Sequence, residues 1–269
     1  MDGWKNILEL KLNETPQSNI PRSQKDTRKS FRQSSGKVSA IPKCRQRANK
    51  PYFRAGHSEM EMISEVFNMD CMEGMKQYPD NHFDLAVCDP PYGIEWMSQV
   101  NNPNEGKNWK KYDYKEWDKN IPNSDYFKEL IRVSQNQIIW GGNYMTNNLY
   151  PSPCWLIWDK MQEFSGAVFE MAWTSFKTPS KAFRMSRVEA YVRQNKIHPT
   201  QKPVALYDWI FKNYATEGMK ILDTHLGSQS SRISAYKYKM DFTGYELDKD
   251  YFKDGCKRFE QFKSQLNLF

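Results

Sequence analysis

Short apolar runs alternate with segments of helical spacing from about residue 60 onward. The apolar runs are rich in Val, Ile, Phe, Trp and Tyr, and they have the usual length of strands. We expect seven strands, at residues 65–69, 83–88, 137–142, 154–159, 168–176, 219–223 and 241–246. The spacing predicts helices over residues 203–214 and 230–240. This alternation is typical of an α/β fold with a doubly wound, mostly parallel sheet.

Positive charge is concentrated in the N-terminal part of the chain. The formal net charge is +7, and residues 1–56 alone hold 13 Lys or Arg against 4 Asp or Glu. This part is rich in Ser, Gln and Pro, so we predict a largely disordered basic tail at 1–57 and a folded domain at 58–269. The tail fits either a solvated leader or an arm that contacts nucleic-acid phosphates.

Other protein classes are disfavoured by what the sequence lacks. No apolar run reaches the length of a membrane span, and the first residues contain no apolar signal segment. The five cysteines include no CxxC pair, and the four histidines show no metal-ligand spacing. We therefore expect a soluble, intracellular protein with reduced thiols and no metal.

Ligands of doubly wound sheets bind beyond the carboxyl ends of the strands. One expected strand ends at Asp223, and a small polar loop with Gly227 follows it. Glu246 ends the next strand, at the separation where such folds place a carboxylate on ribose hydroxyls. The loop lacks the glycine pattern of NAD enzymes and the GKS or GKT of phosphate loops. We expect another adenosine-containing cofactor, with a purely structural role for both acids as the alternative.

The sequence CDPPYGIEW, residues 88–96, interrupts an apolar strand in an unusual way. Its two prolines end the ladder and leave Asp89 and the Pro90 carbonyl as acceptors, with the flat ring of Tyr92 beside them. An exocyclic amine on a nucleobase offers two N–H donors on a planar ring, which matches these groups. A simple strand-terminating turn is the alternative interpretation.

Four motifs in this order resemble S-adenosylmethionine-dependent DNA amino-methyltransferases of the circularly permuted group often called beta. They are DPPY at 89–92, HPTQKP at 198–203, DTHLGSQSS at 223–231 and YELDKDY at 245–251. The resemblance covers about residues 62–262. It implies the Rossmann-like class I methyltransferase fold, S-adenosylmethionine as cofactor, and double-stranded DNA with an extruded target base, as in restriction-modification enzymes.

The resemblance also implies roles for particular residues. Asp89, Pro90, Pro91 and Tyr92 would form the catalytic pocket, in which Asp89 and the Pro90 carbonyl bind the amine and Tyr92 stacks on the base. An aspartate at the first position favours the N6 amine of adenine; the N4 amine of cytosine and RNA remain alternatives. The implied cofactor residues are Asp70, His198, Thr200, Lys202, Asp223, Gly227, Ser228 and Glu246. His198 and Thr200 also suit a helix cap, and Asp70 an ordinary turn.

Target recognition is expected in two inserts, at about 97–125 and 177–197. The second insert contains four basic residues that are candidates for phosphate or guanine contacts: Lys181, Arg184, Arg187 and Arg193. A solvated basic face is the alternative.

The cofactor loop departs from the resembling family at one position. Those loops usually read D-P-F-x-G-S-G-T-T, whereas Gln229 takes the place of the second glycine here. Glycine tolerates a positive φ, which glutamine adopts less easily. The departure predicts weak cofactor binding or a catalytically degenerate, nucleic-acid-binding relative.

Overall fold

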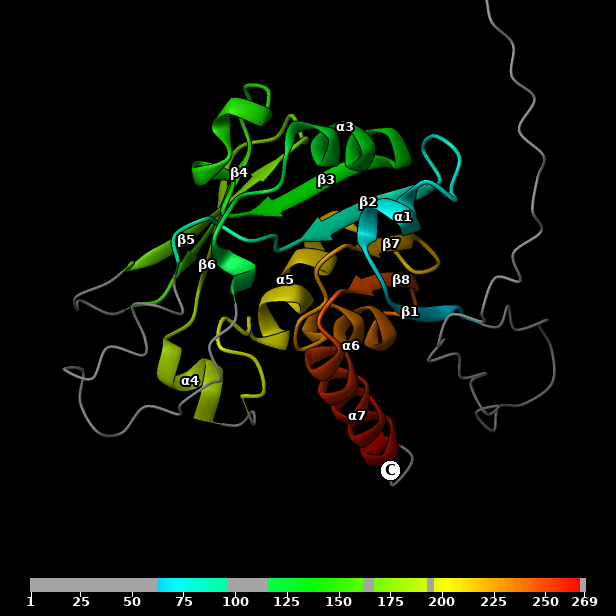
Figure 1. Cartoon of the computed structure of the whole chain (residues 1–269). Helices are drawn as coiled ribbons and strands as arrows, with labels where there is room; N and C mark the ends of the chain where they lie inside the picture. The colour runs from blue at the N-terminus through cyan, green and yellow to red at the C-terminus, as the bar shows by residue number, and fades with distance from the viewer. Residues whose placement is uncertain (1–61, 96–115, 162–166, 193–195, 267–269) are drawn as a thin grey trace, which may run out of the picture. The chain divides into compact units, whose positions relative to one another are not determined.

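The computed structural model describes residues 62–95, 116–161, 167–192 and 196–266 (Figure 1). The predicted tail with its boundary, most of the first insert, and Arg193 lie outside these residues. Within them the chain forms one eight-stranded sheet with helices on both faces. The predicted α/β class with a mostly parallel, doubly wound sheet is confirmed.

The strands lie in the order β1-β8-β7-β2-β3-β5-β4-β6. Five neighbours are parallel: β1 (Ser64–Asn68), β8 (Asp241–Glu246), β7 (Lys220–Asp223), β2 (Phe83–Cys88) and β3 (Ser134–Trp140). β5 (Phe169–Thr174) runs antiparallel to β3 and β4 (Trp155–Asp159), and β6 (Lys181–Arg184) pairs parallel with β4. The five parallel strands bring their carboxyl ends to one edge of the sheet.

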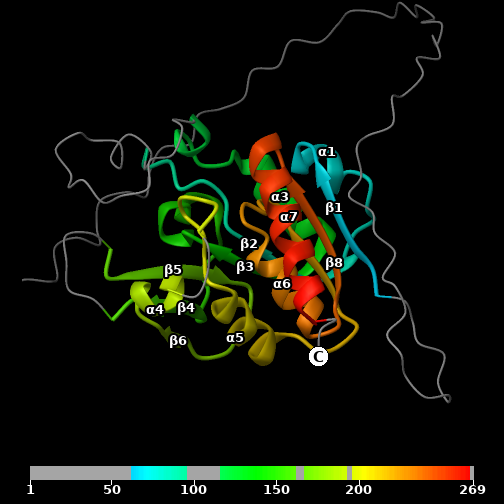
Figure 2. The same cartoon turned by 90° about the horizontal axis from the view of Figure 1, so that it is seen from below.

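Helices cover both faces of this sheet (Figures 1 and 2). α1 (Cys71–Met75) and α3 (Ser124–Val133) lie on one face, and α5 (Val204–Tyr214), α6 (Ser230–Lys237) and α7 (Lys249–Leu266) on the other. The connections contain α4 (Arg187–Val192) and three 3-10 turns, η1 (Glu116–Asp118), η2 (Gly142–Tyr144) and η3 (Thr146–Asn148). None of the described helices is long and apolar enough to cross a membrane.

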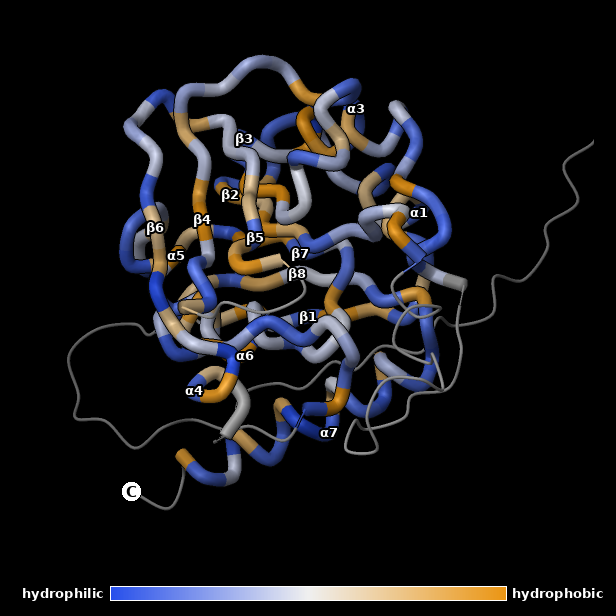
Figure 3. Tube along the Cα trace, turned by 90° about the vertical axis from the view of Figure 1, so that its left-hand side faces the viewer, coloured by the Kyte–Doolittle hydropathy of each residue, from blue (hydrophilic) through white to orange (hydrophobic). Residues whose placement is uncertain are grey.

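Apolar side chains fill the space between the sheet and each helical layer. Along β2, Leu85 and Val87 join the core beside α5, whereas Ala86 and Cys88 join the core beside α3. Because both faces of β2 are buried, its sequence is a continuous apolar run. The central strands are largely hydrophobic in Figure 3, whereas α7 is mostly hydrophilic with spaced hydrophobic positions.

Two strands differ from the expectation for identifiable reasons. β3 begins at Ser134 rather than at residue 137, because Ser134 and Asn136 already pair with Phe83 and Leu85 of β2. It ends at Trp140, since Gly141 takes a φ of 70°. β6 was not expected as a strand, because its mostly exposed side chains at the sheet edge form no apolar run.

Candidate functional site

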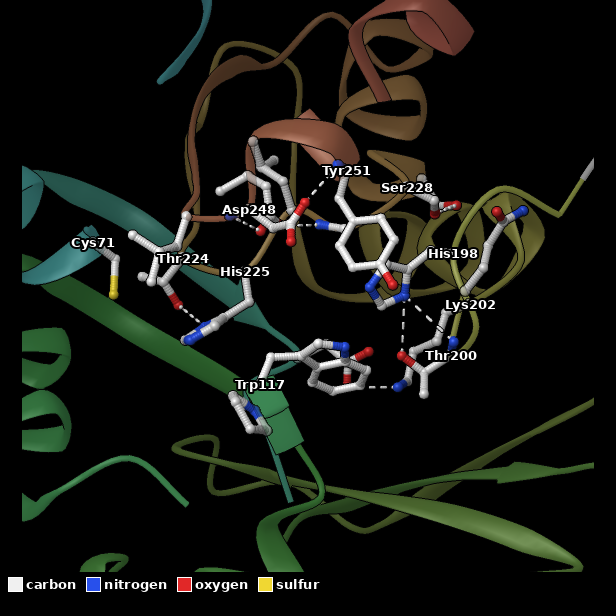
Figure 4. A pocket seen from close by; sticks show the side chains of 18 of the residues that line it. Cys71, Trp117, His198, Thr200, Lys202, Thr224, His225, Ser228, Asp248 and Tyr251 are labelled. Carbon is white, nitrogen blue, oxygen red and sulfur yellow. Dashed lines mark hydrogen bonds and ion pairs between the residues drawn. The ribbon is translucent and has the colours of Figure 1, made fainter. Parts of the chain in front are cut away.

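A cavity of about 800 Å³ lies at the carboxyl ends of the parallel strands (Figure 4). The segments after β1, β2, β7 and β8 line it, together with parts of residues 198–207 and Trp117. The lining includes nine residues predicted from the sequence: Asp70, Asp89, Pro91, His198, Thr200, Lys202, Gly227, Ser228 and Glu246. Three other predicted residues, Pro90, Tyr92 and Asp223, are not among the lining residues.

The Asp89 carboxylate is held through one of its oxygens. Lys202 Nζ lies 2.6 Å from Asp89 Oδ1, and the Tyr92 hydroxyl donates to the same oxygen at 2.8 Å. Lys202 also donates to the Tyr92 hydroxyl at 3.0 Å. Within the described residues Asp89 Oδ2 has no bonded partner, and Asp89 lines the cavity. One carboxylate oxygen is thus available to a ligand.

A second carboxylate, Glu170 on β5, shares the Lys202 ammonium. Lys202 Nζ lies 3.1 Å from Glu170 Oε2, and Lys160 Nζ lies 2.8 Å from Glu170 Oε1. Burial alone raises the pKa of Glu170, but the two ammonium groups outweigh it and lower that pKa to about 2. Burial also raises the pKa of Asp89, and the Lys202 ammonium opposes part of that rise. The four side chains form a compact group of two negative and two positive charges.

The turn that carries Asp89 is held in place by Asp118, which lies within the predicted first insert. Asp118 Oδ1 accepts the backbone N–H of Tyr92 at 2.7 Å and that of Gly93 at 3.1 Å. The Asp118 carbonyl also accepts the N–H of Glu95 at 3.1 Å. Because Asp118 is buried, water competes little for these hydrogen bonds, and they hold the DPPY turn in one conformation.

The ring of Tyr92 packs against the loop after β3. A Cβ on Gly141 would lie 2.2 Å from Tyr92 Cε1, so a larger residue would displace the ring. Tyr144 stacks on Tyr92 with ring centroids 5.3 Å apart. These contacts keep the Tyr92 hydroxyl beside Asp89. The predicted stacking of a target base on Tyr92 stays a prediction.

Glu246 connects the loop after β7 to the start of α7. Its Oε2 accepts the N–H of Gly227 at 2.8 Å, and its Oε1 accepts the N–H of Asp248 at 2.8 Å. Burial raises the pKa of Glu246, and these backbone donors oppose the rise. Each carboxylate oxygen has a second lone pair, so Glu246 can still accept hydrogen bonds from a ligand in the cavity.

Asp223 supports the same loop from inside the protein. Its Oδ1 accepts the N–H of His225 at 3.0 Å, and its Oδ2 accepts the Ser231 hydroxyl. Burial raises the pKa of Asp223 to about 7. The side chain is 1% exposed and shapes the loop from below, whereas the sequence interpretation placed it among the cofactor contacts.

Three other predicted cofactor residues combine local bonds with a place in the cavity wall (Figure 4). Asp70 caps α1 by accepting the N–H of Met72 at 2.7 Å. The N–H of Thr200 donates to His198 Nδ1 at 3.3 Å, and the His198 ring lies edge-on to Tyr251 with centroids 4.2 Å apart. Asp70 thus caps α1 and also lines the cavity, whereas the N-cap of α5 is Pro203 and not His198 or Thr200.

Gln229 adopts the backbone conformation that glycine favours. Its φ is 59° and its ψ is 30°, in the left-handed region. Its side chain is fully buried outside the cavity lining, where Gln229 Oε1 accepts from Arg232 Nη1 at 3.0 Å. A Cβ on Gly255 would lie 2.8 Å from Gln229 Cγ. The loop therefore keeps the turn that the sequence interpretation expected glutamine to disturb.

We expect Gln229→Gly to lower the free energy of unfolding by about 1–3 kcal/mol, because a buried amide that bonds Arg232 is lost. Relief of the left-handed backbone offsets about 1 kcal/mol of this cost. Urea denaturation measures the change, and calorimetry should show cofactor affinity within about twofold of the unsubstituted protein, since the side chain faces away from the cavity.

A second substitution controls this interpretation. Gly255→Ala should destabilise the protein strongly when Gln229 is present, and much less in combination with Gln229→Gly, because the clash is with the Gln229 side chain. Additive effects of the two substitutions would contradict the packing described for Gln229.

The cofactor loop is also bonded to α7 through Arg258. Arg258 Nη1 donates to the Ser228 carbonyl at 2.6 Å and to Ser230 Oγ at 2.9 Å. Burial lowers the pKa of Arg258 to about 10, so its guanidinium remains charged at neutral pH. The loop is thus held by Glu246 on one side and by Arg258 on the other.

The described candidates for DNA contact lie around β6. Lys181 Nζ donates to Asn213 Oδ1 at 2.7 Å, and Arg184 Nε lies 3.4 Å from Asp159 Oδ2. Both side chains are exposed, and Arg187 begins α4. Their contact with DNA stays a prediction.

Four residues near the cavity were not assigned by sequence reasoning: Asp118, Glu170, Trp117 and His225. Trp117 lines the cavity, and its Nε1 has no hydrogen-bond partner among the described residues. Burial lowers the pKa of His225 to about 4, so its ring is neutral at pH 7. The sequence signal for Glu170 was its position as a lone acid inside an apolar run. No cluster of three His, Cys, Asp or Glu side chains suited to a metal occurs in the described part of the chain.

Comparison with known proteins finds a match to a family model and two similar Type II methyltransferases. Residues 158–257, which include HPTQKP, the cofactor loop and Glu246, match the N6/N4 methyltransferase family described as DNA methylase. The Type II methyltransferase M2.MboI of Moraxella bovis is 20% identical in an alignment of 263 residues. That alignment covers 79% of this chain and 92% of that protein. The Type II methyltransferase M2.DpnII of Streptococcus pneumoniae is 26% identical in an alignment of 178 residues. That alignment covers 63% of this chain and 61% of that protein.

Among solved structures, the PvuII DNA methyltransferase, described as cytosine-N4-specific, has a TM-score of 0.51. It is 13% identical, and the similarity covers 77% of this chain and 93% of that one. This likeness confirms the class I methyltransferase fold expected from the motif order. The family match over residues 158–257 and the similarity to two Type II methyltransferases support membership of the N6/N4 DNA methylase family.

Proposed function

We propose that this DNA methyltransferase transfers a methyl group from S-adenosylmethionine to the exocyclic N6 amine of adenine. The match to the DNA methylase family over residues 158–257 supports methyl transfer to DNA and S-adenosylmethionine as the cofactor. The observation that carries the proposed transfer to an exocyclic amine is that Asp89 and the loop held by Glu246 open into the same cavity. A carboxylate for the amine and a carboxylate for the cofactor ribose are thus presented to one space.

The cavity residues fit S-adenosylmethionine. A volume of about 800 Å³ is within the range of small-molecule sites. Glu246 would accept ribose hydroxyls, Asp70 would lie near the adenine, and the segment with His198 and Thr200 near the methionine. When bound, S-adenosylmethionine would supply a methyl group on a sulfonium, from which a neutral thioether departs as a good leaving group.

The residues of the DPPY turn would bind and orient the target amine. Asp89 Oδ2 would accept one N–H, and the Pro90 carbonyl, which no described donor bonds, would accept the other. Two acceptors draw the amine nitrogen toward tetrahedral geometry and expose its lone pair. Tyr92 and Lys202 hold Asp89 Oδ1, so the carboxylate does not rotate away. The rate enhancement would come from positioning the target amine and from electrostatic stabilisation.

The target base would leave the helix of double-stranded DNA to reach Asp89 in the cavity wall. Lys181, Arg184 and Arg187 would contact phosphates, which positions DNA without reading its sequence. If the base stacks on the Tyr92 face that Tyr144 covers, Tyr144 must move. The N4 amine of cytosine presents the same two donors, so Asp89 at the first position of the motif supports adenine through family resemblance alone.

Labelled S-adenosylmethionine and unmethylated double-stranded DNA, followed by mass spectrometry of the nucleosides, test the proposal. We expect the label in N6-methyladenine. Label in N4-methylcytosine would overturn the choice of base, label only in an RNA substrate would overturn the choice of nucleic acid, and no label would favour a nucleic-acid-binding relative without activity.

A further inference from the structure

We propose that Glu170 is a positioning residue for methyl transfer: it shares the Lys202 ammonium with Asp89 and so leaves Asp89 Oδ2 free and strongly accepting toward the target amine. This inference rests on the proposed function of Asp89. Glu170 lies outside the four motifs at 89–92, 198–203, 223–231 and 245–251, on β5 in the antiparallel part of the sheet.

The geometry places Lys202 between two carboxylates. Its Nζ is 2.6 Å from Asp89 Oδ1 and 3.1 Å from Glu170 Oε2, and its side chain is 3% exposed. Lys202 also lies over the ring of Trp140 at 5.3 Å, which further restricts the ammonium. A buried ammonium that contacts two carboxylates stabilises each of them less than it would stabilise one alone. Without Glu170, Lys202 would form its ion pair with Asp89 alone.

Lys160 completes the group and keeps Glu170 ionised. It is 2.8 Å from Glu170 Oε1, on the side away from Lys202, and it extends from the end of β4. An ionised Glu170 competes with Asp89 for Lys202 more strongly than a protonated one would. Lys160 therefore acts on Asp89 indirectly, through Glu170.

The charged and titratable groups around Asp89 come from several elements. Lys202 and Tyr92 bond it directly, and Glu170 faces it across Lys202. Tyr207 on α5 and Asp223 at the end of β7 also interact with its charge. Among these, Lys202 lowers the pKa of Asp89 and Glu170 raises it, so removing each charge shifts that pKa in opposite directions.

The test is a carbon-13 NMR titration of the Asp89 carboxyl, assigned by its loss in Asp89→Asn. We expect Glu170→Gln to lower the midpoint of the Asp89 titration by about one pH unit, because a like charge is removed. In kinetic assays the acid limb of kcat/KM for Glu170→Gln should move in the same direction, since activity requires ionised Asp89. Glu170→Gln should also lower kcat by about tenfold, because Lys202 then binds Asp89 more tightly.

Glu129→Gln is the matched control. Glu129 on α3 has a similarly buried side chain, 18% exposed against 22% for Glu170, and pairs with Arg132 instead. The Glu129→Gln substitution should leave the midpoint of the Asp89 titration unchanged. An Asp89 midpoint that stays constant or rises in Glu170→Gln would overturn the inference. The NMR titration needs no turnover, so a protein that shows the shift but methylates no DNA would refute the proposed function and leave the charge sharing intact.

Discussion

Replacing Asp89 by asparagine should reduce kcat by about 100- to 1,000-fold, because the target amine loses its charged acceptor. The amide keeps the size of the side chain, so the turn should remain folded around Asp118. Cofactor affinity should change little, since Asp89 is proposed to bind the amine and not the cofactor. Single-turnover transfer of a labelled methyl group measures the rate, and calorimetry measures cofactor binding.

Asp84→Asn provides the control on the same strand. Asp84 lies near the start of β2, away from the carboxyl strand ends, and its Oδ2 accepts the N–H of Lys220 at 2.8 Å. An asparagine oxygen can accept the same bond, so the rate should stay within about twofold. Turnover of Asp89→Asn close to that of the control would refute the mechanism.

Glu246→Gln should weaken S-adenosylmethionine binding by about 10- to 100-fold, equivalent to roughly 1.4–2.7 kcal/mol. Both Glu246 oxygens accept backbone N–H groups, from Gly227 and from Asp248. An amide NH₂ would face one of these donors, so the loop would lose a bond where a ribose is expected. Calorimetric titration with the cofactor measures the effect, and kcat at saturating cofactor should fall much less.

The control lies at the other end of the same strand. Asp241 Oδ1 accepts the N–H of Ile63 at 2.8 Å, far along β8 from the carboxyl end. Asp241→Asn should leave the cofactor dissociation constant within about twofold, because asparagine can accept this bond. Equal dissociation constants for Glu246→Gln and the unsubstituted protein would show that Glu246 does not support the cofactor loop.

Sequence patterns predicted the fold well where strands are buried on both faces. The apolar runs at 83–88 and 219–223 end beside Asp89 and Asp223, so the location of the site at the strand ends followed from periodicity and topology rules. α7 was not predicted, because its buried positions, such as Tyr251 and Phe259, are few and widely spaced. A helix that covers a sheet with a narrow apolar stripe leaves a weak pattern.

Contacts within the site depend on which strands are neighbours, and periodicity does not specify this. Lys202 was predicted to lie near the cofactor, yet its ammonium bonds Asp89 and Glu170. Glu170 reaches that ammonium because β5 is inserted antiparallel beside β3. The environment of Gln229 likewise depends on Gly255 of α7, which no local rule connects to the cofactor loop.

The connection of the cofactor loop to Arg258 has a consequence for biosynthesis. Chains fold from the N-terminus as they leave the ribosome, and the DPPY turn emerges 110 positions before Lys202, which orients it. Arg258 emerges later still, and only then do Ser228 and Ser230 acquire their partner on α7. A nascent chain therefore acquires its amine-binding groups before its cofactor loop is secured. Ribosome-bound chains that end before α7 would contain Asp89, the proposed acceptor for the amine, but would lack the Arg258 bonds that hold the loop proposed to bind the methyl donor.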